Sequence, residues 1–203
     1  NGFYYVLDRE TGDFITGQPF AKQTWADGLD AKGRPIVRPN TAPTPEGNRI
    51  CPDAAGATNW GSPSYDPLQR LLLVSVRETC ATYTRVTRRP IPGQGFTGGG
   101  VEVDPGNAPG AIRALDALTG EVRWNFPLFT GASSTGVVAT AGGVAFASSN
   151  DGYLIALDQR TGKYLWRHYT GAPIVASPMA YAVDGHQYIA IASQSAIMTF
   201  ALR

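Results

Sequence analysis

The chain has 203 residues, with 17 basic and 16 acidic side chains, a formal net charge of +1 and only 16% charged residues. Abundant Gly (24) and Pro (15) predict short strands joined by tight turns and argue against a helical bundle or a disordered chain. No apolar run approaches the roughly 18 residues of a membrane span, and no basic cluster has the size typical of a nucleic-acid surface. We therefore expect no membrane span and no nucleic-acid partner.

A repeated motif occurs three times along the chain. The segments near 1–16, 110–126 and 151–168 each contain a short apolar strand followed by Asp-x-x-Thr-Gly. In the second and third copies a Trp follows, and we expect both of these residues, Trp124 and Trp166, to lie in the core. Equivalent positions in the last two copies are 42 residues apart. A period of about 40 to 55 residues with several strands is typical of propeller blades.

The repeated Asp-x-x-Thr-Gly sequence has the chemistry of a turn between two strands. The Asp side chain can accept hydrogen bonds from backbone N–H groups, and Gly can take the positive φ that closes a tight turn. Asp8, Asp116 and Asp158 occupy the same slot of the repeat. We therefore interpret them as structural turn residues and not as calcium ligands.

Further strands are predicted between the repeats. One apolar run spans 71–76, and two hairpins are indicated by the turn sequences Gly142-Gly143 and Asp184-Gly185 between apolar segments. No segment has the 3.6-residue periodicity of a helix over three turns. The fold class is therefore all-β.

We predict one partial β-propeller domain over 1–203, built of four-stranded antiparallel blades. The length accommodates about four blades. The chain begins within a predicted strand, so an eight-bladed ring lacking its first half is favoured over a closed four-bladed ring.

The chain has two cysteines, Cys51 and Cys80, which are 29 residues apart. Two cysteines do not complete a four-ligand zinc site without help from other side chains. A disulfide is the favoured interpretation, and two buried thiols are the alternative. A disulfide would indicate an oxidising compartment, so we expect a periplasmic or secreted protein.

The repeats resemble the tryptophan-docking motifs of the PQQ-dependent (quinoprotein) alcohol dehydrogenases, the methanol and ethanol dehydrogenase family, where PQQ is pyrroloquinoline quinone. Four other segments also resemble that family: NGFYYVLDRETG, ICPDAAGATNWGSPSYDP, TGVVATAGGVAFASSNDGYLIALD and HQYIAIASQSAIMTFAL. The resemblance implies the C-terminal blades of an eight-bladed propeller that holds PQQ and Ca²⁺ near its axis.

The resemblance also suggests residues that bind the cofactor. Asn59 and Trp60 match the segment that contacts the quinone, and Gln194 is a further candidate in the loop of the closing strands. Ser134 stands where methanol dehydrogenase-like members have a Trp against the quinone ring. The resemblance implies a Cys51–Cys80 disulfide as well. No catalytic residue or metal ligand is assigned in this chain, because the family's catalytic Asp and calcium ligands belong to upstream blades.

The implied function is a PQQ- and calcium-dependent oxidation of small alcohols to aldehydes, with cytochrome c as electron acceptor. On this interpretation the chain is inactive by itself and is completed by N-terminal blades or a second chain. The alternative is a non-catalytic propeller that acts as a binding or assembly scaffold.

Overall fold

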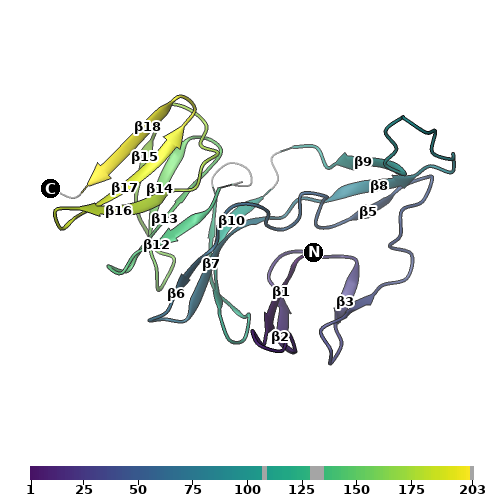
Figure 1. Cartoon of the computed structure of the whole chain (residues 1–203), viewed down its shortest axis with the longest axis horizontal. Coiled ribbons are helices and arrows are strands. Elements are labelled where there is room, and N and C mark those ends of the chain that lie inside the picture. The colour runs from purple at the N-terminus through teal and green to yellow at the C-terminus, as the bar shows by residue number, and fades with distance from the viewer. Residues whose placement is uncertain (107–108, 129–134, 202–203) are drawn as a thin grey trace.

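The computed structural model describes residues 1–106, 109–128 and 135–201, and in this part of the chain all regular structure is β-strand. The strands form six antiparallel sheets, which Figure 1 shows arranged side by side along the molecule. The prediction of an all-β fold is confirmed.

One complete four-stranded blade lies near the middle of the molecule (Figure 1). Its order is β11-β10-β7-β6, with bounds Ser64–Asp66 for β6, Leu71–Arg77 for β7, Gly110–Asp116 for β10 and Val122–Pro127 for β11. The apolar run predicted at 71–76 forms most of β7, which is central in the sheet and is covered on both faces.

The second complete blade follows directly in the sequence. Its strands are β12 (Val137–Ala139), β13 (Val144–Ser148), β14 (Tyr153–Asp158) and β15 (Tyr164–Tyr169), and they pair in chain order. The turn predicted at Gly142-Gly143 joins β12 to β13 and places Gly143 at a φ of 81°. This meander is the arrangement expected of a propeller blade.

Incomplete sheets lie at the two ends of the chain. At the C-terminal end, a three-stranded sheet contains β16 (Met179–Val183), β17 (His186–Ser193) and β18 (Ala196–Ala201). The predicted Asp184-Gly185 turn joins the first two of these strands. At the N-terminal end, β1 (Phe3–Leu7) pairs with β2 (Phe14–Pro19) in a two-stranded sheet. Four-stranded blades are therefore seen twice in the described chain, and the other blade-like sheets have three and two strands.

Five short strands were not predicted from the sequence. They form a two-stranded and a three-stranded sheet: β3 (Ala26–Leu29), β4 (Pro35–Val37), β5 (Asn48–Ile50), β8 (Ala81–Arg85) and β9 (Gly99–Val103). Strands β8 and β9 belong to the connection between β7 and β10, and Figure 1 shows their sheet at the far end of the molecule from β16–β18.

The main core lies between the two complete blades. It includes Leu71, Leu73, Ile112, Ala114 and Trp124 from the first blade, and Val137, Ala145, Ala147, Ile155 and Leu157 from the second. Most of these side chains are fully buried, and burial of apolar area is the main force that holds neighbouring blades together. This shared core fixes the position of one complete blade relative to the other.

The two tryptophans of the repeat differ in burial. Trp124 is 9% exposed, as predicted, but Trp166 is 40% exposed, so its assignment to the core was wrong. Trp166 lies in β15, the outermost strand of its blade, where every residue is exposed. Its ring stacks on His168 of the same strand, at 6.0 Å between ring centroids, and meets the edge of the Phe200 ring of β18 at 5.6 Å.

The repeat aspartates close the turns as expected. Asp116 Oδ1 accepts hydrogen bonds from Leu118 N at 2.9 Å and Thr119 N at 3.1 Å. These backbone donors, together with Arg123, hold the pKa of Asp116 below its usual value. Asp158 is held in the same way by Thr161, whose hydroxyl donates at 2.6 Å, and its pKa is also lowered.

Candidate functional site

The register of the first complete blade distinguishes its two ends. In the pairing of β7 with β10, Arg77 lies opposite Gly110, whereas Leu71 lies opposite Asp116. The repeat turn that contains Asp116 is therefore at one end of the blade, and the C-terminal end of β7 is at the other. In the pairing of β6 with β7, Ser64, the first residue of β6, lies opposite Leu73. The segment that leads into β6 therefore approaches the Arg77 end of the blade.

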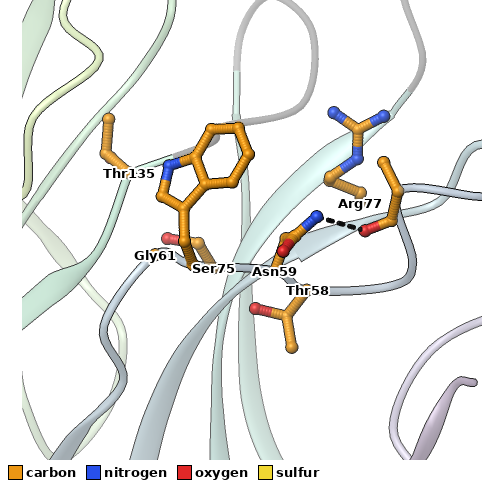
Figure 2. A pocket seen from close by; sticks show the side chains of 8 residues that line it. Thr58, Asn59, Gly61, Ser75, Arg77 and Thr135 are labelled. Atoms are coloured by element: carbon orange, nitrogen blue, oxygen red, sulfur yellow. Dashed lines mark hydrogen bonds between the residues drawn. The ribbon is translucent and has the colours of Figure 1, made fainter.

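A pocket lies at this end of β7 (Figure 2). Its wall consists of Ala55, Thr58, Asn59, Trp60, Gly61, Ser75, Arg77 and Thr135. Figure 2 shows Arg77 and Thr135 on opposite sides, with Asn59 and Ser75 between them. Two of the predicted cofactor-binding residues, Asn59 and Trp60, are thus neighbours in one pocket.

Asn59 and Trp60 are both available to a ligand. Asn59 Nδ2 donates to the carbonyl oxygen of Ala55 at 3.1 Å, which fixes the amide (Figure 2). The remaining amide N–H and the amide oxygen are free to pair with another molecule. Trp60 is 74% exposed, so a large aromatic surface borders the pocket.

An ion pair ties the loop that carries Asn59 to strand β7. Arg77 Nη2 donates to Asp53 Oδ2 at 3.1 Å, and the other oxygen of Asp53 accepts from Ala55 N at 3.0 Å. The Asp53 side chain is 2% exposed, and a buried carboxylate requires such partners. Backbone bonds from Arg77 N to Ala57 O and from Asp53 N to Thr79 O complete the attachment.

A disulfide lies directly beside this attachment. Cys51 and Cys80 are bonded, with their Cα atoms 4.2 Å apart, which confirms the predicted bridge. The bridge joins Cys51, two positions before Asp53, to Cys80 in the short connection between β7 and β8. The segment 51–59 is therefore anchored both covalently and by hydrogen bonds.

The second blade closes the other side of the pocket through a tight backbone contact. A Cβ atom at Gly61 would lie 2.6 Å from the carbonyl oxygen of Thr135, so only glycine fits there. Thr135 is fully buried, and its side-chain oxygen accepts from Ser148 Oγ at 2.7 Å. The pocket therefore forms where the two complete blades meet.

Two residues that line this pocket carry a buried polar atom without a hydrogen-bond partner. Among the described residues, Ser75 Oγ, Arg77 Nε and Thr79 Oγ1 are buried and have no hydrogen-bond partner. Ser75 and Arg77 line the pocket, whereas Thr79 does not. Unpaired buried polar groups are rare in folded proteins, and beside a pocket they mark a place where a water molecule or a ligand can bind.

The other two predicted cofactor residues are placed differently. Ser134 lies outside the described residues, next to Thr135. Gln194 is exposed in the turn between β17 and β18, at a φ of 47°, and is not part of the pocket wall. The sequence did not single out Ser75 or Arg77, because nothing in a strand sequence marks a buried atom that has no partner. It did not single out Thr135 either, because its place in the wall depends on how the two blades meet.

The described residues hold neither a cluster of metal-ligating side chains nor a membrane-spanning helix. No group of three His, Cys, Asp or Glu side chains is placed to hold a metal ion. No helix in this part of the chain is long and apolar enough to cross a membrane.

The family model "Glucose/ethanol/alcohol dehydrogenase, beta-propeller domain" matches residues 127–189. The chain is 34% identical over 206 residues to the quinoprotein alcohol dehydrogenase PedH of Pseudomonas putida, a match that covers 95% of this chain and 34% of that protein. It is 33% identical to the lanthanide-dependent methanol dehydrogenase of Methylacidiphilum fumariolicum, covering 95% of this chain and 33% of that protein. Over almost its whole length, the chain is thus similar to quinoprotein alcohol dehydrogenases, of which it spans about a third.

Solved structures of the family agree with this fold. The quinohemoprotein alcohol dehydrogenase ADHIIG from Pseudomonas putida HK5 matches with a TM-score of 0.87 and 28% identity, over 97% of this chain and 31% of that chain. A europium-containing methanol dehydrogenase matches with a TM-score of 0.84 and 32% identity, over 94% of this chain and 34% of that chain. The chain spans about a third of the length of the curated relatives that it matches.

Proposed function

We propose that this chain forms part of the cofactor site of a PQQ-dependent alcohol dehydrogenase that oxidises alcohols to aldehydes. The observation that carries the proposal is the pocket at the end of β7, where Asn59 and Trp60 lie beside buried donors that have no partner. The curated relatives named above are dehydrogenases, which favours an enzyme over a non-catalytic scaffold.

The residues of the pocket fit a planar quinone that carries several oxygen atoms. The exposed indole of Trp60 offers a flat surface for stacking, and the Asn59 amide offers both a donor and an acceptor to the edge of the ring. When bound, PQQ supplies the acceptor for the hydride of the alcohol. The role of this chain is then to hold and orient the ring. Ser134 and Gln194 stay predictions as further contacts.

We propose Ca²⁺ or a lanthanide as the metal of the complete site, with its ligands in parts of the protein outside this chain. The names of two relatives, a lanthanide-dependent and a europium-containing methanol dehydrogenase, support both types of ion. A metal ion beside the quinone would act as a Lewis acid.

Small alcohols and a cytochrome c are the proposed partners. Relatives include a 1-butanol dehydrogenase (cytochrome c) of Thauera butanivorans and a methanol dehydrogenase [cytochrome c] subunit 1 of Paracoccus denitrificans. The Cys51–Cys80 disulfide supports a periplasmic or extracellular location, because disulfides persist in oxidising compartments.

Dye-linked oxidation of methanol, ethanol and 1-butanol tests the proposed activity. The full-length protein that contains this chain is reconstituted with PQQ and either Ca²⁺ or La³⁺. We expect alcohol oxidation that depends on PQQ, about tenfold lower in Asn59→Ala because one hydrogen bond to the cofactor is lost, and unchanged in His186→Ala, whose side chain is exposed on another blade. We expect no turnover from the isolated 203-residue chain. Absence of PQQ-dependent oxidation with both metals would contradict the proposal.

A further inference from the structure

Ser75 and Arg77 project from the same face of β7. Residues two apart in a strand point to the same side of the sheet, and both side chains reach the pocket wall. Ser75 is 4% exposed, and its hydroxyl has no partner. Arg77 Nε is also buried and unpaired. Two donors on one strand thus face the same space and are not used within the described protein.

Two nitrogen atoms of the Arg77 guanidinium differ in their hydrogen bonding, because Nη2 has a partner and Nε has none. Nη2 is bound to the buried Asp53 carboxylate, which is itself oriented by Ala55 N. Asp53 therefore holds the guanidinium in place and leaves Nε unpaired. A guanidinium fixed in this way is prepared to donate to an oxygen atom with little loss of side-chain freedom.

The pocket also has an excess of donors. Asn59, Ser75 and Arg77 all line it, and the acidic side chain of Asp53 beside Arg77 is engaged by that arginine. Donors gathered around a cation are suited to an anionic ligand with several oxygen atoms, such as a carboxylated quinone.

We propose that Ser75 Oγ and Arg77 Nε, together with Asn59, donate hydrogen bonds to oxygen atoms of the bound quinone. Asp53 acts only through Arg77, as a positioning residue. This inference rests on the proposed function, since it assigns further binding residues to that cofactor site.

Equilibrium titration of the full-length apoprotein with PQQ, in the presence of Ca²⁺, tests the assignment through quenching of tryptophan fluorescence. The variants are Ser75→Ala and Arg77→Lys, which keeps a cation for Asp53 but removes Nε. The matched control is Thr79→Val, which deletes another buried, unpaired hydroxyl that does not line the pocket. Thermal unfolding of each apoprotein is measured in parallel.

We expect Ser75→Ala and Arg77→Lys each to raise the Kd for PQQ about tenfold, the effect of losing one hydrogen bond to a charged ligand. Ser75→Ala and Thr79→Val should leave the apoprotein as stable as before or more stable, because each removes an orphaned hydroxyl. Thr79→Val should bind PQQ normally.

The outcomes separate this inference from the proposed function. Normal PQQ affinity in Ser75→Ala, with a wild-type protein that binds, overturns the role of Ser75 and leaves the proposed function intact. An equal loss of affinity in Thr79→Val would show that substitutions near the end of β7 weaken binding whether or not they line the pocket, and would also overturn the inference. A wild-type protein that binds no PQQ overturns both.

Discussion

The indole ring of Trp124 in β11 lies directly against Gly162, in the β14–β15 turn of the neighbouring blade. A Cβ atom at Gly162 would be 2.5 Å from Cε3 of the ring, so only glycine allows this contact. Trp124 Nε1 also donates to the carbonyl oxygen of Gln159 at 3.0 Å. One side chain therefore joins two blades by packing and by a hydrogen bond.

A tyrosine makes the equivalent contact one blade earlier. The ring of Tyr4 lies over Gly120, where a Cβ atom would be 2.9 Å from Tyr4 Cδ1. The Tyr4 hydroxyl donates to the carbonyl oxygen of Ala117 at 3.0 Å, and burial, with the nearby Asp116 charge, raises the pKa of Tyr4. The first repeat lacks the Trp, and Tyr4 of β1 supplies the aromatic ring in its place.

Replacing Trp124 tests the contribution of this contact to stability. We expect Trp124→Ala to lower the free energy of unfolding by about 3–5 kcal/mol, because it leaves a cavity in the core and an unpaired carbonyl. Trp166→Ala, at the equivalent position of the next repeat, should cost less than half as much because that ring is 40% exposed. Denaturation by urea measures both, and equal losses would contradict the account.

A pair of glycine substitutions isolates the ring contact from backbone strain. Gly162 and Gly12 both have positive φ, 70° and 78°, but a Cβ atom would meet the Trp124 ring at Gly162 and nothing within 4 Å at Gly12. Gly12→Ala should therefore cost only the conformational strain, about 1 kcal/mol. Gly162→Ala should cost clearly more. Similar unfolding free energies for the two variants would show that the ring can move aside.

The turn aspartates predict a loss of stability in acid. Thr161, through its hydroxyl and backbone N–H, lowers the pKa of Asp158 in the folded protein. A lowered folded pKa means stabilisation that is fully present above the unfolded value, about 4, and is lost as the pH falls through the folded value. We expect Asp158→Asn to have a shallower fall in unfolding free energy between pH 6 and pH 2 than the wild type. Parallel acid profiles would contradict this assignment.

Removal of the disulfide should affect both stability and the site. For Cys51→Ala with Cys80→Ala, we expect a loss of about 3–4 kcal/mol in unfolding free energy, because the unfolded chain gains freedom. PQQ affinity should fall as well, since the segment that leads to Asn59 loses its covalent anchor. Titration with PQQ well below the unfolding temperature separates the second effect from the first. Unchanged affinity would show that the Arg77–Asp53 ion pair positions Asn59 without the bridge.

Local sequence signals predicted much of the fold. The Gly142-Gly143 and Asp184-Gly185 turns and the apolar run at the start of β7 were found because turn chemistry and apolar patterning act over a few residues. The burial of Trp166 was not predicted correctly, because burial depends on which strand lies beyond β15. The contact of the Tyr4 ring with Gly120 was not predicted either, since these residues are far apart in the sequence.

The site was predicted in part. Asn59 and Trp60 came from a resemblance in one continuous segment, and the structure places both in a pocket. The Arg77–Asp53 ion pair and the unpaired Ser75 hydroxyl required three-dimensional contacts, since a Ser or Arg within a strand has no distinctive sequence pattern. The contact of Gly61 with Thr135 likewise depends on how two blades approach each other.

The crystal structure of the full-length protein reconstituted with PQQ is the most direct test of the central claim, that the pocket at the end of β7 holds the cofactor. We predict quinone density beside the Trp60 indole, with a quinone oxygen within hydrogen-bonding distance of Asn59. Density for PQQ elsewhere, with only water between Asn59, Ser75 and Arg77, would contradict the account.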